Sequence, residues 1–248
     1  MIAERLDLSF IAARLEGLEE TIISKLIDRA QFCTNSTVYK TGESGFIGDA
    51  SHSLFEIRLI EQEQMDARFG RFCAPEERPF TKDLPSPQRV VTIPDCGLRI
   101  TNYELISQSN EILCSYLDLI PRICMDGDDG QYGSSVEHDI YVIQAIARRI
   151  HYGALYVAES KYTNETELYR SLIISKDQNA VLERLTRKSI EDRIVDRIRE
   201  KTISTQSMAN RLVRNVIDPD IIAEYYKNWI IPLTKKGEIA YLFNRQDI

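Results

Sequence analysis

Two cations stand on a segment whose pattern is otherwise that of a buried helix. Apolar residues recur there every three or four positions, which marks one face of an amphipathic helix: Ile140, Ile143, Ile146, Ala147 and Ile150. Arg149 and Lys161 share this segment. A guanidinium cannot lose its charge, and its burial is costly unless an anion meets it. The two cations are therefore candidates for half of a site for an anionic ligand. The alternative is that both lie on a solvated helix face.

Three more polar side chains stand in helical segments. Thr234 and Glu238 are four residues apart and project from one face just after Pro232, while Glu191 lies between two apolar positions. Singly, each has a structural explanation, because helix carboxylates are usually solvated and a threonine after a proline often bonds a freed carbonyl. Together with the two cations they form a candidate site. No serine or cysteine triad, phosphate-binding glycine loop or metal motif competes with it.

The composition is that of an ordinary globular protein and predicts a single domain over residues 1–248. The chain has 248 residues, of which 43% are hydrophobic and 28% charged. The net charge of −7 and the lack of a basic block argue against nucleic acid as a partner. An anionic metabolite remains compatible with an acidic surface, because a few local cations can line a pocket.

The cysteines, histidines and N-terminus favour a cytoplasmic protein without a metal. The five cysteines contain no CxxC pair, as expected of reduced thiols, and the three histidines have no ligand spacing. The first residues, Met-Ile-Ala-Glu-Arg-Leu-Asp, lack the apolar core of a signal peptide. No apolar run approaches the length of a membrane span.

Hydrophobic periodicity predicts an all-α fold, a single-domain helical bundle with long connecting loops. The first helix begins at Asp7 or Ser9 and keeps a heptad-like stripe for about 25 residues. Further helices are predicted at residues 54–71, 103–119, 136–162, 167–175, 179–201 and from Asp218 to the C-terminus, with a kink at Pro232. Residues 74–95 carry five prolines and predict a loop, in which 89–93 could be a strand without a partner. The acidic turn at 126–130 has some likeness to a calcium loop, but a solvated turn fits better.

Four blocks of sequence occur in a characteristic order along the chain, at residues 19–30, 71–80, 133–161 and 231–242. The most specific are Arg148-Arg149-Ile150-His151-Tyr152-Gly153 and Ile231-Pro232-Leu233-Thr234-Lys235. In these blocks the chain resembles the all-helical chorismate mutases of yeasts and plants over essentially its whole length. The resemblance implies a homodimer that rearranges chorismate to prephenate, in phenylalanine and tyrosine biosynthesis, and uses no cofactor.

The resemblance also implies roles for the polar residues. Arg149 would grip a substrate carboxylate, and Lys161 with a protonated Glu238 would donate to the breaking ether oxygen. Glu191 would accept from the ring hydroxyl, and Thr234 would assist at the other carboxylate. Glu238 must be neutral to donate, so burial must raise its pKa and activity should fall as pH rises.

The sequence departs from the family pattern in the substrate site. Ala12 stands where the family has an arginine. The nearest cation, Arg14, is the candidate substrate-binding residue in its place, but it lies about 200° around the helix and would need a local irregularity to reach the pocket. Arg149 and Lys161 are twelve residues apart instead of eleven, so a one-residue π-bulge near residues 153–156 is needed to bring Lys161 back to the pocket. Without the bulge, Ser160 would face the pocket. Arg187 replaces an asparagine and could supply the missing positive charge.

The family's binding site for aromatic amino acid effectors is altered too. Arg71, Gly133 and Ser134 match it, but Gly70 replaces an arginine and Glu137 replaces a threonine. The sequence thus predicts weak or no allosteric control. The main alternative to a working enzyme is a catalytically impaired relative that acts as a binding or interaction protein.

Overall fold

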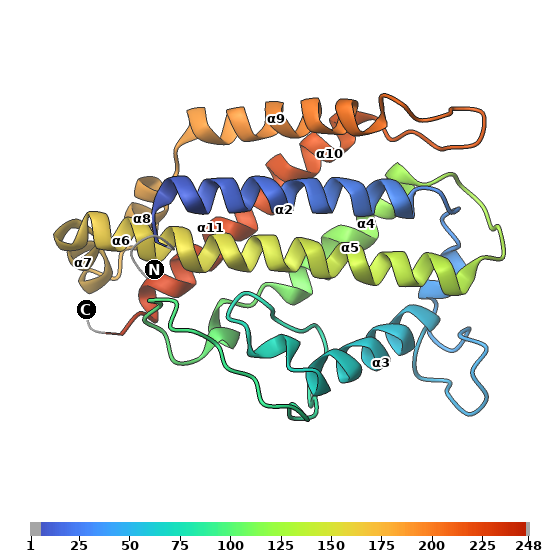
Figure 1. Cartoon of the computed structure of the whole chain (residues 1–248), viewed down its shortest axis with the longest axis horizontal. Coiled ribbons are helices and arrows are strands. Elements are labelled where there is room, and N and C mark those ends of the chain that lie inside the picture. The colour runs from blue at the N-terminus through green and yellow to red at the C-terminus, as the bar shows by residue number, and fades with distance from the viewer. Residues whose placement is uncertain (1–5, 247–248) are drawn as a thin grey trace.

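The computed structural model describes residues 6–246, and all regular structure within them is helical (Figure 1). This confirms the predicted fold class. The α-helices are α2 (Leu8–Arg29), α3 (Leu54–Arg68), α4 (Ser109–Ile123), α5 (Tyr132–Tyr152), α6 (Ala158–Asn164), α7 (Thr166–Ile174), α8 (Gln178–Leu185), α9 (Lys188–Gln206), α10 (Pro219–Tyr225) and α11 (Ile231–Phe243). Short 3₁₀ turns are η1 (Ser36–Tyr39), η2 (Arg71–Cys73) and η3 (Tyr103–Ile106), and two π-turns are η4 (Gly153–Val157) and η5 (Tyr226–Ile230).

The two longest helices, α2 and α5, lie side by side at the centre of the molecule (Figure 1). Asp7 caps α2 by accepting from the backbone N–H groups of Ser9 and Phe10, which decides between the two predicted caps. At the other end, the fully buried Arg29 donates to Asp139 of α5 at 2.5 Å. The hydroxyl of Tyr116 on α4 donates to the same carboxylate at 2.6 Å. This buried network fixes how α2, α4 and α5 pack against one another.

Several predicted elements are shorter than expected. Helix α3 ends at Arg68, because Gly70 adopts a left-handed φ of 82°, and Arg71 therefore starts a 3₁₀ turn. The predicted strand at residues 89–93 is wrong: the segment is irregular and Val90 is 90% exposed, with no strand beside it in the described part of the chain. The helix predicted at 103–119 is divided into η3 and α4.

The single helix predicted at residues 179–201 is also wrong, because the chain breaks between α8 and α9. Thr186 takes an extended conformation (φ −79°, ψ 120°) and its hydroxyl donates to the Leu182 carbonyl at 2.8 Å. A side chain that satisfies the last carbonyls of a helix in this way competes with its continuation. The break places Arg187 as the residue before α9.

The helix predicted from Asp218 onward begins as expected, with Asp218 as cap and Pro219 in the first turn. It is interrupted by the π-turn η5 directly before Pro232. A proline has no N–H to donate and its ring crowds the preceding turn, and a π-turn accommodates both effects.

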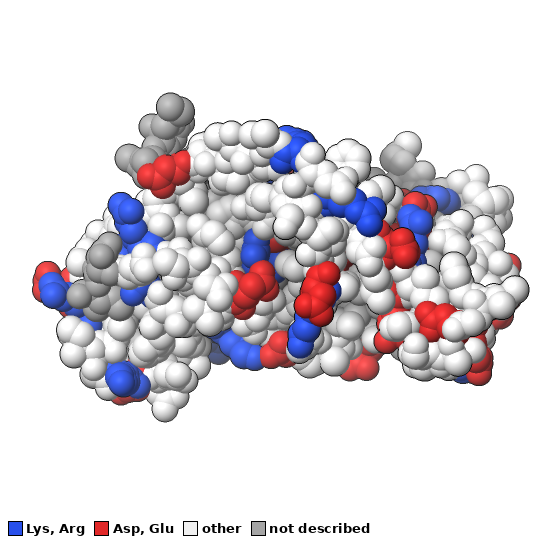
Figure 2. All heavy atoms as spheres, turned by 90° about the horizontal axis from the view of Figure 1, so that it is seen from below, with Lys and Arg blue, Asp and Glu red and all other residues white. Residues whose placement is uncertain are grey.

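The remaining helices enclose the central pair. Helix α9 packs along α2 (Figure 1). Helices α10 and α11 cross behind α2, and helices α6 to α8 lie together at one end of the molecule (Figure 1). The apolar core divides into two clusters, one around α2, α4, α5 and α10, and one around η4, α6, α8 and α11. On the face seen in Figure 2, acidic and basic side chains are interspersed, without a continuous field of one sign. None of the helices described between residues 6 and 246 is long and apolar enough to cross a membrane.

Candidate active site

A cavity of about 490 Å³ opens where α2, α9 and α11 meet the π-turn between α5 and α6. A volume of this size suits a small metabolite. Its cations are Arg149, Lys161, Arg187, Arg197 and Lys235, and its carboxylates are Glu16, Glu19, Glu191 and Glu238. The other lining residues are mostly aliphatic, so the charges act in a weakly screened environment.

Arg149 provides a buried cation in this cavity. Its side chain is 3% exposed, and its Nη1 donates to the Thr234 hydroxyl at 2.9 Å. Its Nε has no hydrogen-bond partner, and no carboxylate of the described residues forms an ion pair with it. A buried guanidinium without a neutralising anion is costly, so the geometry favours an anionic ligand at this point.

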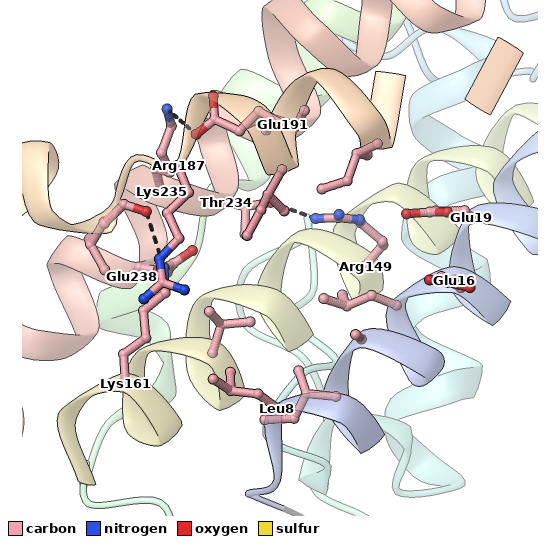
Figure 3. Close-up of a pocket in the computed structure, with 18 of the residues that line it drawn as sticks. Leu8, Glu16, Glu19, Arg149, Lys161, Arg187, Glu191, Thr234, Lys235 and Glu238 are labelled. Atoms are coloured by element: carbon pink, nitrogen blue, oxygen red, sulfur yellow. Dashed lines mark hydrogen bonds and ion pairs between the residues drawn. The ribbon is translucent and has the colours of Figure 1, made fainter. Parts of the chain in front are cut away.

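Lys161 and Glu238 form a buried ion pair at the opposite side of the cavity from Glu19 (Figure 3). The Lys161 Nζ lies 3.0 Å from the Glu238 Oε2 and also donates to the Leu185 carbonyl at 3.2 Å. Burial raises the pKa of the Glu238 carboxyl above its usual range, although the charges of Lys161 and Arg149 oppose the shift. The pair therefore combines a fixed cation with a carboxyl group that gains a proton more readily than usual.

The π-turn η4 brings Lys161 into this position. It spans Gly153–Val157 and absorbs the extra residue between Arg149 and Lys161, which confirms the predicted bulge. Ser160 does not face the cavity, because its hydroxyl donates to the Leu6 carbonyl at 2.6 Å. Gly153 is required for close packing, since a Cβ there would lie 2.7 Å from the Thr234 Cγ2.

The structure brings together six of the predicted substrate-site residues: Arg149, Lys161, Arg187, Glu191, Thr234 and Glu238 (Figure 3). The Glu191 carboxylate accepts from the Lys235 Nζ at 3.0 Å. Thr234 also donates to the Ile230 carbonyl at 2.7 Å, so its hydroxyl accepts from Arg149 while it satisfies a carbonyl of the preceding helical turn. Arg187 lines the rim and is exposed.

No protein-family model matches the chain. A chorismate mutase of Schizosaccharomyces pombe is 35% identical and covers 99% of this chain and 98% of its own. Chorismate mutase 2 of Petunia hybrida is 34% identical over 98% of this chain and 95% of its own. The crystal structure of a Candida albicans chorismate mutase in complex with L-Trp matches with a TM-score of 0.91 at 34% identity, over 100% of this chain and 96% of that one.

The chain belongs to the chorismate mutase family. These enzymes are isomerases, specifically intramolecular transferases. The solved relatives are all-helical chorismate mutases of eukaryotes, as the sequence predicted. They include the chloroplast enzyme of Zea mays, with a TM-score of 0.85 over 97% of this chain and 95% of that one.

Neither Ala12 nor Arg14 supplies the cation that the chorismate mutase pattern predicts on α2. The candidate substrate-binding role of Arg14 is wrong: its side chain is exposed and does not line the cavity, because α2 is regular there and turns it about 200° away from Ala12. Ala12 does line the cavity, so this wall of the substrate site is apolar where the family pattern predicts a guanidinium.

Sequence reasoning missed Arg197, Lys235, Glu16 and Glu19, all of which line the cavity. A signal for Arg197 was available, because residues 187, 190, 194 and 197 recur every three or four positions and therefore share one face of α9. The high charge of that helix concealed the pattern.

The predicted effector residues are not brought together within this chain. Arg71 donates to the Gln144 side chain at 2.5 Å, while Gly133 and Ser134 are exposed in the first turn of α5. Gln144 lies ten residues from Ser134 on the same helix, which is roughly 15 Å of helical rise. The Arg71 guanidinium also pairs with Asp66 at 2.9 Å and Glu77 at 3.0 Å, so three side chains of its own chain already occupy it.

Proposed function

We propose that this protein rearranges chorismate to prephenate within the cavity that contains Arg149, Lys161 and Glu238. The observation that carries the proposal is the Lys161–Glu238 pair, a cation beside a buried carboxyl group, facing the same cavity as a buried guanidinium. A unimolecular rearrangement needs no nucleophile and no cofactor. The protein has to hold the flexible dicarboxylate in its compact reactive shape and stabilise the negative charge that grows on the ether oxygen.

The charge of the cavity lining suits a dianion. Five cations face four carboxylates, which leaves one excess positive charge when every group is ionised and two when Glu238 is neutral. The raised pKa of Glu238 favours the neutral form. In that form Glu238 and Lys161 both donate hydrogen bonds, and both can reach the same acceptor oxygen.

The other residues take positions consistent with substrate binding. Arg149 holds one substrate carboxylate. Thr234 orients the Arg149 guanidinium by accepting its 2.9 Å hydrogen bond. Glu191, positioned by Lys235, accepts from the ring hydroxyl. Arg187 adds a positive charge at the rim, where it attracts the dianion before it is bound.

Loss of chorismate absorbance, measured with purified protein, tests the proposal directly. We expect turnover that falls by about two orders of magnitude or more in Arg149→Met and in Lys161→Met, the range found when a charged group that stabilises a transition state is removed. Absence of turnover in the unmodified protein, with chorismate still bound, would instead support the alternative function, an impaired relative retained as a binding protein.

The observation that favours an impaired binding protein is Ala12, which places a methyl group in the cavity wall where the family pattern has a cation. We expect Ala12→Arg to raise kcat/KM by about tenfold, as one charge-assisted hydrogen bond would. Arg14→Ala serves as the matched control on the same helix, because its side chain is exposed outside the cavity.

We further propose that the protein is a cytosolic homodimer with weak or absent control by aromatic amino acids. The relatives include a cytosolic enzyme of Zea mays and chloroplastic enzymes, so location varies among them. Solved relatives carry tryptophan, or phenylalanine or tyrosine in an allosteric site. Here the internal partners of Arg71, and the Glu137 carboxylate paired with Arg58 at 3.1 Å, oppose such binding.

A further inference from the structure

The wall of the cavity between α2 and α9 holds a second guanidinium, that of Arg197. Its Nε donates to the Glu19 Oε2 at 3.0 Å, and its Nη2 donates to the Glu19 Oε1 at 2.8 Å. Its Nη1 lies 3.1 Å from the Glu16 Oε1. Arg197 thus binds the Glu19 carboxylate through Nε and Nη2 and contacts the Glu16 carboxylate through Nη1.

The two carboxylates differ in how firmly they are held. The Glu19 side chain is fully buried and is also approached by the Lys201 Nζ at 3.5 Å. The Glu16 side chain is 44% exposed and contacts Arg197 through a single nitrogen. Exposed ion pairs contribute little free energy, because water replaces the partner readily. Glu16 can therefore leave Nη1 at small cost, whereas Glu19 cannot.

Arg197 and Arg149 approach the same buried carboxylate. Figure 3 shows the Arg149 guanidinium extended from Thr234 toward Glu19, and Arg197 holds Glu19 from the α9 side. Because Arg197 pairs with Glu19, both guanidiniums lie on the Glu19 side of the cavity. Figure 3 shows Lys161 and Glu238 on the other side.

A dicarboxylate bound by Arg149 needs a cation for its second carboxylate. Lys161 is engaged by Glu238 and Lys235 by Glu191. Arg187 is exposed and stands ten residues before Arg197, roughly 15 Å along α9 and away from the wall that holds Glu19. Ala12 has no charge. On the Glu19 side of the cavity, Arg197 is the guanidinium that lines the wall together with Arg149.

We infer that Arg197 is a further substrate-binding residue, whose Nη1 exchanges the Glu16 carboxylate for a carboxylate of the substrate. The inference rests on the proposed function. In the structure the Glu16 carboxylate occupies the Nη1 position where a substrate carboxylate would bind. When the substrate binds, the Glu16 side chain rotates into solvent. Glu16 is thus a competitor of the substrate, and its removal improves binding.

Two variants test the exchange by steady-state kinetics of chorismate loss. We expect Glu16→Gln to lower KM by up to about fivefold, the value of one exposed ion pair. We expect Arg197→Met to lower kcat/KM by about 10- to 150-fold, the loss of a charge-assisted hydrogen bond. The matched control is Arg199→Met, which removes exposed pairs to Asp196 and Asp220 on the same helix and lies outside the cavity.

The sign of the Glu16→Gln effect separates this inference from a structural role. If the Glu16–Arg197 pair only ties α2 to α9, the variant lowers the melting temperature and leaves KM unchanged or raised, which would overturn the inference. The KM of Glu16→Gln does not depend on the Arg197→Met variant. That variant leaves the buried Glu19 carboxylate without its main partner and can therefore lose stability.

A binding experiment keeps the test independent of turnover. The probes are a bicyclic ether dicarboxylate shaped like the compact conformer and the same compound with one carboxylate replaced by hydrogen. We expect the unmodified protein to prefer the dicarboxylate by about tenfold or more, and Arg197→Met to lose this preference. Equal preference in both proteins would refute the role of Arg197. A protein that shows the preference but does not consume chorismate would refute the proposed function alone.

Discussion

At the residue scale, the site depends on charges that helices place in an apolar setting. Arg149 and Lys161 could be identified from the sequence because a cation on a buried helical pattern calls for an anion. The pairing of Lys161 with Glu238 followed only from the family resemblance, because it joins residues 77 positions apart and depends on how α6 packs on α11. The spacing of residues 187, 190, 194 and 197 places Arg197 on one face of α9, but that this face meets Glu19 of α2 depends on packing.

The Glu238 carboxyl gives the site a defined pH dependence. Burial raises its pKa, so the protonated, hydrogen-donating form is lost as pH rises through that value, and kcat/KM should fall in the same direction. A glutamine is a neutral donor at every pH. We expect Glu238→Gln to show a flat profile over the pH range in which the unmodified protein loses activity as pH rises.

Glu191→Gln is the control, because it removes a cavity carboxylate paired with Lys235 and leaves Glu238 intact. Its activity should decrease while its pH slope is retained. Parallel slopes in Glu238→Gln and the unmodified protein would contradict the assigned role.

At the element scale, periodicity predicted most helices but not their interruptions. The breaks at Thr186 and at Gly70 depend on a side-chain hydrogen bond and a left-handed backbone, which are local choices that a hydrophobic pattern does not report. The π-turn at Gly153–Val157 could be predicted because the site needs Lys161 on the face of Arg149, and one extra residue rotates a helix by about 100°. The π-turn was thus predicted from the spacing of Arg149 and Lys161 in the family pattern and not from hydrophobic periodicity.

The packing of Gly237 against the π-turn keeps Lys161 in register with Glu238. A Cβ on Gly237 would lie 2.6 Å from the Cβ of the fully buried Ala154. Gly237→Ala should therefore push the π-turn away from α11, costing about 1–3 kcal/mol of stability, and should lower kcat/KM. Moving the methyl across the contact, in Ala154→Gly with Gly237→Ala, should restore both.

Thermal unfolding and chorismate kinetics measure the two effects separately. Rescue of stability without rescue of activity would show that the contact serves folding but does not position Lys161. Gly17→Ala is the matched control, because a Cβ there has no heavy atom within 4 Å.

At the scale of the whole molecule, the acidic surface and the all-helical fold followed from composition and pattern, whereas the response to pH and effectors depends on packing. His151 illustrates this. It is fully buried in α5 and its Nε2 accepts from the Gln108 N–H at 3.0 Å, joining α5 to the start of α4. Burial, with a contribution from the Arg78 charge, lowers its pKa to about 3.

A folded-state pKa below the unfolded value of about 6.5 makes the protein less stable in acid. Between these two values the unfolded chain binds one more proton, so the free energy of unfolding falls by about 1.4 kcal/mol per pH unit as the pH decreases. Gln at position 151 can accept the same hydrogen bond without titrating. We expect His151→Gln to show a shallower loss of stability between pH 6.5 and 4.5 in urea titrations, roughly the upper part of that window.

Effector control is the property in which this chain should differ most from its relatives. The Arg71 guanidinium is already satisfied by Asp66, Glu77 and Gln144, and a ligand carboxylate would have to displace one of them. The missing neighbouring cation cannot simply be restored, because Gly70 has a φ of 82° and a Cβ there would lie 2.3 Å from the Val91 side chain. We therefore expect saturating tryptophan or tyrosine to change kcat/KM by less than about twofold, since site-to-site coupling of about 1 kcal/mol already gives fivefold. Steady-state rates with and without each amino acid measure this, and a several-fold change in either direction would show that the internal partners of Arg71 yield to an effector.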